Sequence, residues 1–164
     1  MCSWYFDSGL CTAVKALGIA NRSEDSIEGC LAILLQFRED LPRALGDGKL
    51  RDDIDHMKCR LESLSDDTIC TMQENNDKKT TTLISLYSYL AHIAHYRRPW
   101  LVGSLSLRMV ELEIKNGLSP MFPVSLTYFG GTLVNLGCIT HGCRLGVYSL
   151  GLAYSCINFY SIIP

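Results

Sequence analysis

Apolar side chains recur at helical spacing along the chain of 164 residues, and no stretch shows the sustained apolar–polar alternation of a β-strand. The clearest series is Leu50, Ile54, Met57, Leu61 and Leu64. Its steps of four and three residues place all five side chains on one face of a helix. The same spacing predicts seven helices, at about residues 4–20, 23–38, 50–64, 81–96, 99–116, 120–136 and 141–159. The sequence therefore predicts an all-α fold.

Short turns separate most of the predicted helices. Ser23 is placed as an N-cap, and Glu24 and Asp25 follow it where the helix dipole favours acidic side chains. Asn116-Gly117 is typical of a helix C-terminus, and Ser119-Pro120 is typical of a new helix start. Because the turns are short, consecutive helices are expected to run antiparallel. Pairs that recur at roughly 35 to 45 residues predict stacking as a tetratricopeptide-like α-solenoid.

Residues 1–164 are predicted to form a single helical-repeat region with one candidate internal boundary. Residues 66–80 are mostly polar, which predicts an exposed loop, with or without one short turn of helix. Small residues recur in the last two predicted helices, and they are expected to let neighbouring helices approach closely. These residues are Gly130, Gly131, Gly146, Gly151 and Ala153.

Composition excludes one class of partner and indicates a compartment. Lys plus Arg number 15 against 17 Asp plus Glu, for a net charge of -2, which gives no basic surface for nucleic acid. The eight cysteines lie singly on apolar stripes, so we expect buried, reduced thiols. Reduced thiols are typical of a reducing compartment, and the sequence therefore predicts a cytoplasmic protein.

A membrane protein with a C-terminal helical hairpin, at about residues 120–164, is the alternative structure. No Asp, Glu, Lys or Arg lies between Lys115 and Arg144 or after Arg144, and the two stretches are long enough to span a bilayer. Both stretches are diluted by Gly, Ser, Thr and Asn, however, and Pro120 and Pro123 interrupt the first. True spans are usually more uniformly aliphatic. The sequence therefore favours buried helices of a helical protein.

The densest group of metal-ligand side chains is Cys138, His141 and Cys143. Their spacing differs from that of a zinc knuckle, so a turn with two core cysteines is favoured and a small zinc-binding protein is the lesser alternative. His92 and His95 share a helix face without a nearby carboxylate. The glycines and serines match no phosphate-binding or hydrolase motif. The sequence predicts neither an enzyme nor a cofactor.

Arg97, Arg98 and Trp100 form the one cationic and aromatic spot that the pattern leaves exposed. Because Trp and Arg dominate binding hot spots, this spot is a candidate interaction surface for a peptide or an acidic partner. The simpler interpretation is a helix C-terminus whose charge suits the helix dipole, with Trp100 packed as a wedge between helices.

Four segments resemble the helical-repeat region of large predicted-ATPase signalling proteins. The segments are 27–42, 83–99, 107–120 and 137–153. The most specific feature is the Gly-Leu-Ser-Pro junction at residues 117–120. Proteins of this family join an AAA-like (STAND) nucleotide-binding module to a long tetratricopeptide-like array. Many add a serine/threonine kinase, or a GAF and histidine-kinase module.

The resemblance implies a non-catalytic scaffold for protein–protein contact or for signal relay between modules. Its partners would be other modules of the parent chain or a peptide. Nucleotide-binding and kinase modules would lie outside residues 1–164, and the chain would be a fragment of a larger array. The apolar C-terminal helices also predict self-association.

Overall fold

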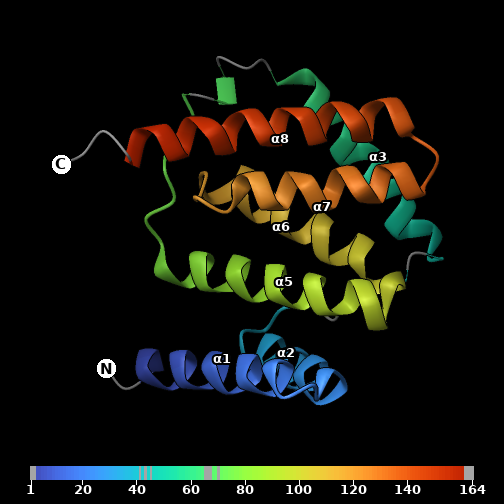
Figure 1. Cartoon of the computed structure of the whole chain (residues 1–164). Helices are drawn as coiled ribbons and strands as arrows, with labels where there is room; N and C mark the ends of the chain where they lie inside the picture. Colours follow the sequence, from blue (N-terminus) through green and yellow to red (C-terminus); the bar gives the residue numbers. More distant parts are fainter. Residues whose placement is uncertain are drawn as a thin grey trace.

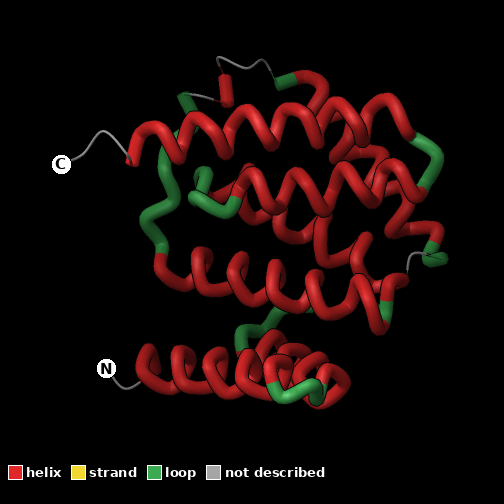
Figure 2. The backbone as a smooth tube through the Cα atoms, in the orientation of Figure 1, coloured by secondary structure: helices red, strands yellow, loops and turns green. Residues whose placement is uncertain are grey.

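The computed structural model describes residues 3–40, 42, 44, 46–64, 68, 69 and 71–160, and it describes the side chains of those that lie between 11 and 153. Within these residues there are seven α-helices and no β-strand (Figure 2), so the all-α prediction is confirmed. The helices are α1 (Ser3–Ile19), α2 (Ser23–Gln36), α3 (Gly48–Ser63), α5 (Lys78–Arg97), α6 (Val102–Asn116), α7 (Phe122–Asn135) and α8 (Ile139–Tyr160). A single 3-10 turn, Pro99–Leu101, leads into α6.

Most helices pack on their neighbours in the chain (Figure 1). α1 packs on α2, α2 on α5, α5 on α6, α6 on α7 and α7 on α8. α1 also contacts α5, and α5 contacts α7. α3 departs from this order, because it follows α2 in the sequence but packs on α6. The chain therefore inserts α3 between two helices, α2 and α5, that are in contact.

Two apolar clusters hold the helices together, and α6 contributes to both. One cluster joins α1, α2, α5 and α6 and contains Leu105 and Met109 of α6. The other joins α3, α6 and α7 and contains Leu107 and Val110 from the opposite side of α6. The stripe of α3 is buried as the spacing predicts, at Leu50, Ile54, Met57 and Leu61. Leu64, the last member of the predicted series, is only half-buried just after α3.

The described part of the polar segment 66–80, residues 68, 69 and 71–80, is mostly exposed as predicted, but it is not a loop throughout. Its last three residues already belong to α5, because the Asp77 carboxylate accepts the backbone N–H groups of Lys79 and Thr80 and so caps the helix. The Thr80 hydroxyl also donates to this carboxylate, and these bonds lower the pKa of Asp77. Helix α5 therefore begins three residues earlier than the apolar pattern predicts.

Earlier in this segment, at residues 73–75, backbone hydrogen bonds join it to the junction between α6 and α7. The Leu118 N–H donates to the Gln73 carbonyl at 3.0 Å, and the Asn75 N–H donates to the Leu118 carbonyl at 2.9 Å. Gly117 makes this approach feasible. Its φ is +100°, and a Cβ atom there would lie 2.5 Å from the Gln73 carbonyl oxygen.

Two predicted helix starts are displaced. Ser23 is the first residue of α2 rather than its cap, and the capping position belongs to Arg22, whose side chain makes no capping hydrogen bond. The second displaced start is that of α7, which begins at Phe122 rather than at Pro120. The Ser119 hydroxyl accepts the Met121 N–H, and the buried Glu113 carboxylate accepts both the N–H and the hydroxyl of Ser119. Glu113 therefore fixes the turn that precedes α7.

The close approach of α7 and α8 depends on two glycines. A Cβ atom on Gly142 would lie 2.6 Å from the Val134 Cγ2 atom and closer still to the Gly130 carbonyl oxygen. The small-residue prediction is thus right for Gly130 and misses Gly142. It is wrong for Gly131, Gly146 and Gly151, where a Cβ atom would meet nothing within 4 Å.

Neither α7 nor α8 has the composition of a membrane-spanning helix. Among the described residues, no helix is long and apolar enough to cross a bilayer.

Candidate functional site

A groove runs along the line where α1 and α5 lie side by side (Figure 1). It consists of two hollows of about 690 Å³ and about 300 Å³, which share Tyr89 as a common wall. The larger hollow is lined by Thr12 and Lys15 of α1 and by Thr81 and Ser85 of α5, among others. We call the two hollows together the α1–α5 groove. Its length follows α5, the 20-residue helix that forms one entire side.

Tyr89 of α5 forms hydrogen bonds with both α1 and α2. Its hydroxyl lies 3.1 Å from the Ser26 Oγ atom of α2 and donates to the Val14 carbonyl of α1 at 3.3 Å. The Ser26 hydroxyl donates to the same carbonyl at 2.8 Å. Gly18 leaves the space that this phenol occupies, because a Cβ atom there would collide with the Tyr89 hydroxyl. These bonds hold α1 at a fixed distance from α5.

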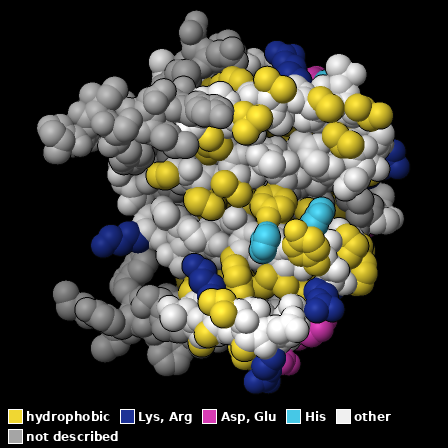
Figure 3. Space-filling view, in the orientation of Figure 1, with side chains coloured by type: hydrophobic (Ala, Val, Ile, Leu, Met, Phe, Trp, Pro, Cys, Tyr) yellow, Lys and Arg dark blue, Asp and Glu magenta, His cyan; other side chains and the backbone are white. Residues whose placement is uncertain are grey.

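Aromatic and imidazole side chains surround the smaller hollow. His92, Tyr96 and Arg97 of α5 face Ile19 at the end of α1. Ile19 is 88% exposed and Tyr96 is 73% exposed, which are high values for side chains of this size. The ring of Tyr96 meets His92 and His95 edge-on, at centroid distances of 5.8 and 5.1 Å. Figure 3 shows histidine side chains among hydrophobic side chains on one face of the molecule.

The described residues that line the groove carry positive charge and include no carboxylate. Lys15 and Lys78 line the larger hollow, and Arg97 lines the smaller one. Within the described part of the chain, none of the three forms an ion pair, and neither hollow is lined by Asp or Glu. The sequence holds a signal for this surface that our prediction did not use: no acidic residue occurs from Lys78 to Val110.

The predicted spot at Arg97, Arg98 and Trp100 is divided by the structure. Arg97 joins the groove, whereas Arg98 pairs with Glu24 at 2.7 Å and with Glu28 at 2.6 Å. Arg98 therefore fastens the end of α5 to α2, and it is not a free cation for a partner. Trp100 is 51% exposed in the 3-10 turn, so it is not a wedge buried between helices.

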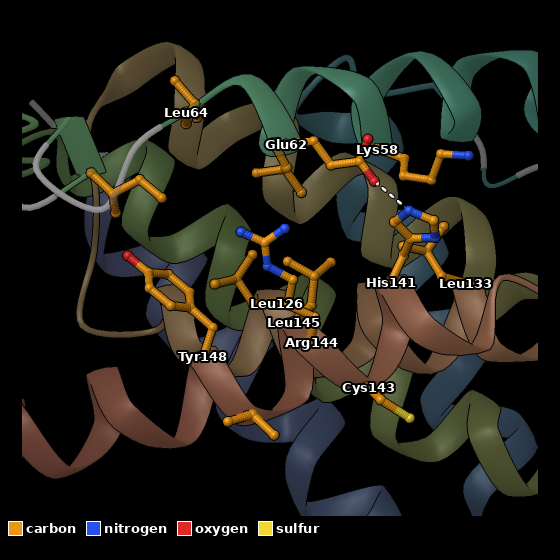
Figure 4. Close-up of a pocket in the computed structure, with 13 residues that line it drawn as sticks. Lys58, Glu62, Leu64, Leu126, Leu133, His141, Cys143, Arg144, Leu145 and Tyr148 are labelled. Carbon is orange, nitrogen blue, oxygen red and sulfur yellow. Dashed lines mark ion pairs between the residues drawn. The ribbon is translucent and has the colours of Figure 1, made fainter.

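A second cavity, of about 450 Å³, lies between α3, α7 and α8 (Figure 4). Its walls are largely leucine side chains, and Tyr148 contributes another wall. At its rim, the His141 Nε2 atom lies 2.9 Å from the Glu62 Oε1 atom. Arg144 extends its guanidinium group into the gap between α8 and α3.

The structure does not assemble the candidate zinc ligands. Cys138 is half-buried, His141 is turned toward Glu62 of α3, and Cys143 is exposed and points away from that gap (Figure 4). In the described ranges, no three or more His, Cys, Asp or Glu side chains are grouped so that they could hold a metal ion. His92 and His95 are likewise engaged at Tyr96.

The cysteines differ from the predicted buried stripe. Five are described, all as free thiols, and only Cys30 is buried, while Cys59 and Cys143 are exposed. Burial, and the nearby Cys11, raise the pKa of the Cys30 thiol to about 12, so it stays protonated and packs as an apolar side chain.

Comparisons of the chain with protein-family models, with curated proteins and with solved structures found no match.

Proposed function

We propose that this protein is a non-catalytic helical scaffold whose α1–α5 groove binds an extended, acidic segment of a partner protein. The observation that carries the proposal is the exposed ring of Tyr96 beside three cations, Lys15, Lys78 and Arg97, in a groove where the described lining residues include no carboxylate and form no ion pair with these cations. Aromatic and arginine side chains supply most of the energy at protein interfaces. Complementary charge selects an anionic partner over a neutral or cationic one.

The dimensions of the groove set the length of the segment. The 20 residues of α5 extend about 30 Å at 1.5 Å per residue. An extended peptide covers this distance with about nine residues at roughly 3.3 Å each. Lys78 and Arg97 lie at the two ends of α5, and Lys15 lies on α1 across the groove. Acidic side chains near both ends of the peptide and near its middle would meet these cations.

The stacked arrangement of antiparallel pairs is part of this proposal. It is supported by contacts of α1 with α5 and of α5 with α7, because in an array of helix pairs the first helix of each pair touches the first helix of the next. Helix α3 is the exception to the repeat. We also carry forward the resemblance to predicted-ATPase signalling proteins: the scaffold would relay the docking of a partner between modules of such a protein. Sequencing the transcript on both sides of the chain tests that relay, since a phosphate-binding lysine loop or a histidine-kinase core should be encoded nearby.

Fluorescence anisotropy with two labelled probe peptides tests the groove itself. One peptide alternates Glu with Leu over about nine residues, and the other has Lys in place of each Glu. We expect the acidic peptide to bind and the basic peptide to bind at least tenfold more weakly. Lys15→Gln and Arg97→Gln should each lower the affinity for the acidic peptide by about fivefold, since an exposed ion pair contributes up to about 1 kcal/mol.

Two control variants distinguish binding in the groove from a general effect of removing positive charge. Arg60→Gln removes an exposed cation of α3, and Arg98→Gln removes a cation that already pairs within the chain. Neither should change the affinity by more than about twofold. Equal affinity for both peptides, or an Arg60→Gln effect as large as that of Arg97→Gln, would contradict the proposed function.

A further inference from the structure

A cavity outside the α1–α5 groove combines apolar walls with Arg144, a cation that has no ion-pair partner among the described residues. It lies between α3, α7 and α8 and encloses about 450 Å³, which is within the range of small-molecule sites in proteins. Leu126 and Leu133 of α7 are buried beneath it, and Leu61 of α3 and Leu145 of α8 close its sides. The leucine side chains would thus accept an alkyl chain, and the polar side chains lie in the remainder of the lining.

Basic side chains outnumber acidic ones among the described residues around this cavity. Among the described residues, its lining includes Lys58, His141 and Arg144 but one acid, Glu62. Glu62 is already engaged with His141 at 2.9 Å, and Lys58 lies 3.4 Å from Asp55. Arg144 has no ion-pair partner among the residues that the structure describes. Figure 4 shows its guanidinium group in the gap between α8 and α3.

We propose that this cavity binds a free, medium-chain alkyl carboxylate, with its tail among the leucines and its carboxylate on Arg144. An uncharged alkyl ligand would gain no charge attraction from the guanidinium group, and an alkyl cation would be repelled by it. A guanidinium group offers a carboxylate two parallel N–H donors, which suits a single anionic head at the rim of an apolar site. The site is separate from the α1–α5 groove, so it adds an activity to the proposed scaffold.

Calorimetric titration with decanoate, decanol and decyltrimethylammonium tests the head group. We expect decanoate to bind at least tenfold more tightly than decanol, and the cation not to bind. Arg144→Gln should reduce the decanoate affinity by about tenfold and leave decanol unchanged, because a hydrogen bond to a charged group is lost. The matched control is Arg51→Gln, which removes an exposed arginine of α3 that does not line the cavity. It should leave both affinities unchanged.

The tail is tested by chain length and by filling the cavity. Each buried methylene contributes about fourfold in affinity, so octanoate should bind about fifteenfold more weakly than decanoate. Leu64→Phe places a larger side chain at a half-buried position of the lining, so it should lower the affinities for decanoate and decanol by similar factors. Circular dichroism confirms that each variant folds. Absence of decanoate binding, equal binding of decanoate and decanol, or an Arg144→Gln protein that binds decanoate normally would overturn the proposal. If Lys15→Gln and not Arg144→Gln weakened decanoate, the ligand would belong to the α1–α5 groove.

Discussion

The crossing of α7 and α8 makes a sharp prediction, because two glycines on α8 only one turn apart should respond oppositely to the same substitution. At Gly142, an added Cβ atom would lie 2.6 Å from the Val134 Cγ2 atom and 3.1 Å from the Val134 backbone nitrogen, and it would meet the Gly130 carbonyl oxygen. Two of these atoms belong to the backbone of α7, so the helices themselves must move apart. At Gly146, the same atom would meet nothing within 4 Å.

The magnitudes follow from these surroundings. Gly→Ala in a helix gains about 1 kcal/mol of stability from helix propensity alone. Overpacking a close contact costs about 1–3 kcal/mol. Gly146→Ala should therefore raise the free energy of unfolding by up to about 1 kcal/mol. Gly142→Ala should lower it by up to about 2 kcal/mol, because the steric cost exceeds the gain.

The assay is urea unfolding of the two variants and the parent, followed by circular dichroism. Because both variants share the propensity gain, the difference between them isolates the steric cost, and it should be about 1–3 kcal/mol. Thermal midpoints should differ by about 2–4 °C for each kcal/mol in a chain of this size. If Gly142→Ala stabilises the protein as much as Gly146→Ala does, the two helices do not cross at these residues.

Three further predictions concern the junctions and the core. Gly117→Ala should destabilise the protein by at least about 1–2 kcal/mol, since φ is +100° and the Gln73 carbonyl oxygen is 2.5 Å from the new atom. Hydrogen exchange at the Asn75 and Leu118 amides should also accelerate, and unchanged exchange would contradict the docking of this segment. Burial raises the pKa of Glu113 above its usual value, although bonds from Ser119 and Ser125 oppose the shift. The folded state then holds this proton more tightly than the unfolded state does, so the stabilisation from Glu113 is complete below its unfolded pKa and is lost as pH rises through the folded pKa. Urea unfolding from about pH 4 to about pH 8 should show this loss in the parent and not in Glu113→Gln, and identical slopes would refute it. Finally, iodoacetamide with mass spectrometry should label Cys59 and Cys143 in the native protein and Cys30 only after unfolding, since Cys30 is fully buried and its pKa is about 12. Native labelling of Cys30 would show that its core opens.

The sequence predicts helices well where one face is buried, and less well where a helix lies at the edge. Helix α3 buries four of the five residues that the spacing selects, because it packs on α6. Around α1 the apolar spacing also selects Ala13 and Ala20, yet both are exposed, and Val14 is the buried side chain among the described residues 11–19. Leu35 of α2 is similarly 55% exposed. Periodicity identifies an apolar face but does not show how much of it a neighbouring helix covers.

Contacts between residues far apart in the sequence are the part of the site that apolar periodicity does not predict. Arg98 lies 74 residues from Glu24, so the pairing that removes it from the candidate surface is invisible in the local sequence. The groove itself is made by the contact of α1 with α5, and its cations come from both helices. In the same way, Gly142 resembles other helical glycines until the backbone of α7 is placed against it. The absence of acidic residues along α5 was the one local signal for a cationic surface.

The most direct measurement is a nuclear magnetic resonance titration of the whole chain with the acidic probe peptide. If the α1–α5 groove is the binding site, the shifted signals should include Lys15, Tyr89, His92 and Arg97, and signals of α3 should stay in place. Arg97→Gln should move the midpoint to higher peptide concentration by about fivefold. Shifts confined to α3, or a midpoint that Arg97→Gln does not change, would contradict the account of this protein as a scaffold for an acidic partner.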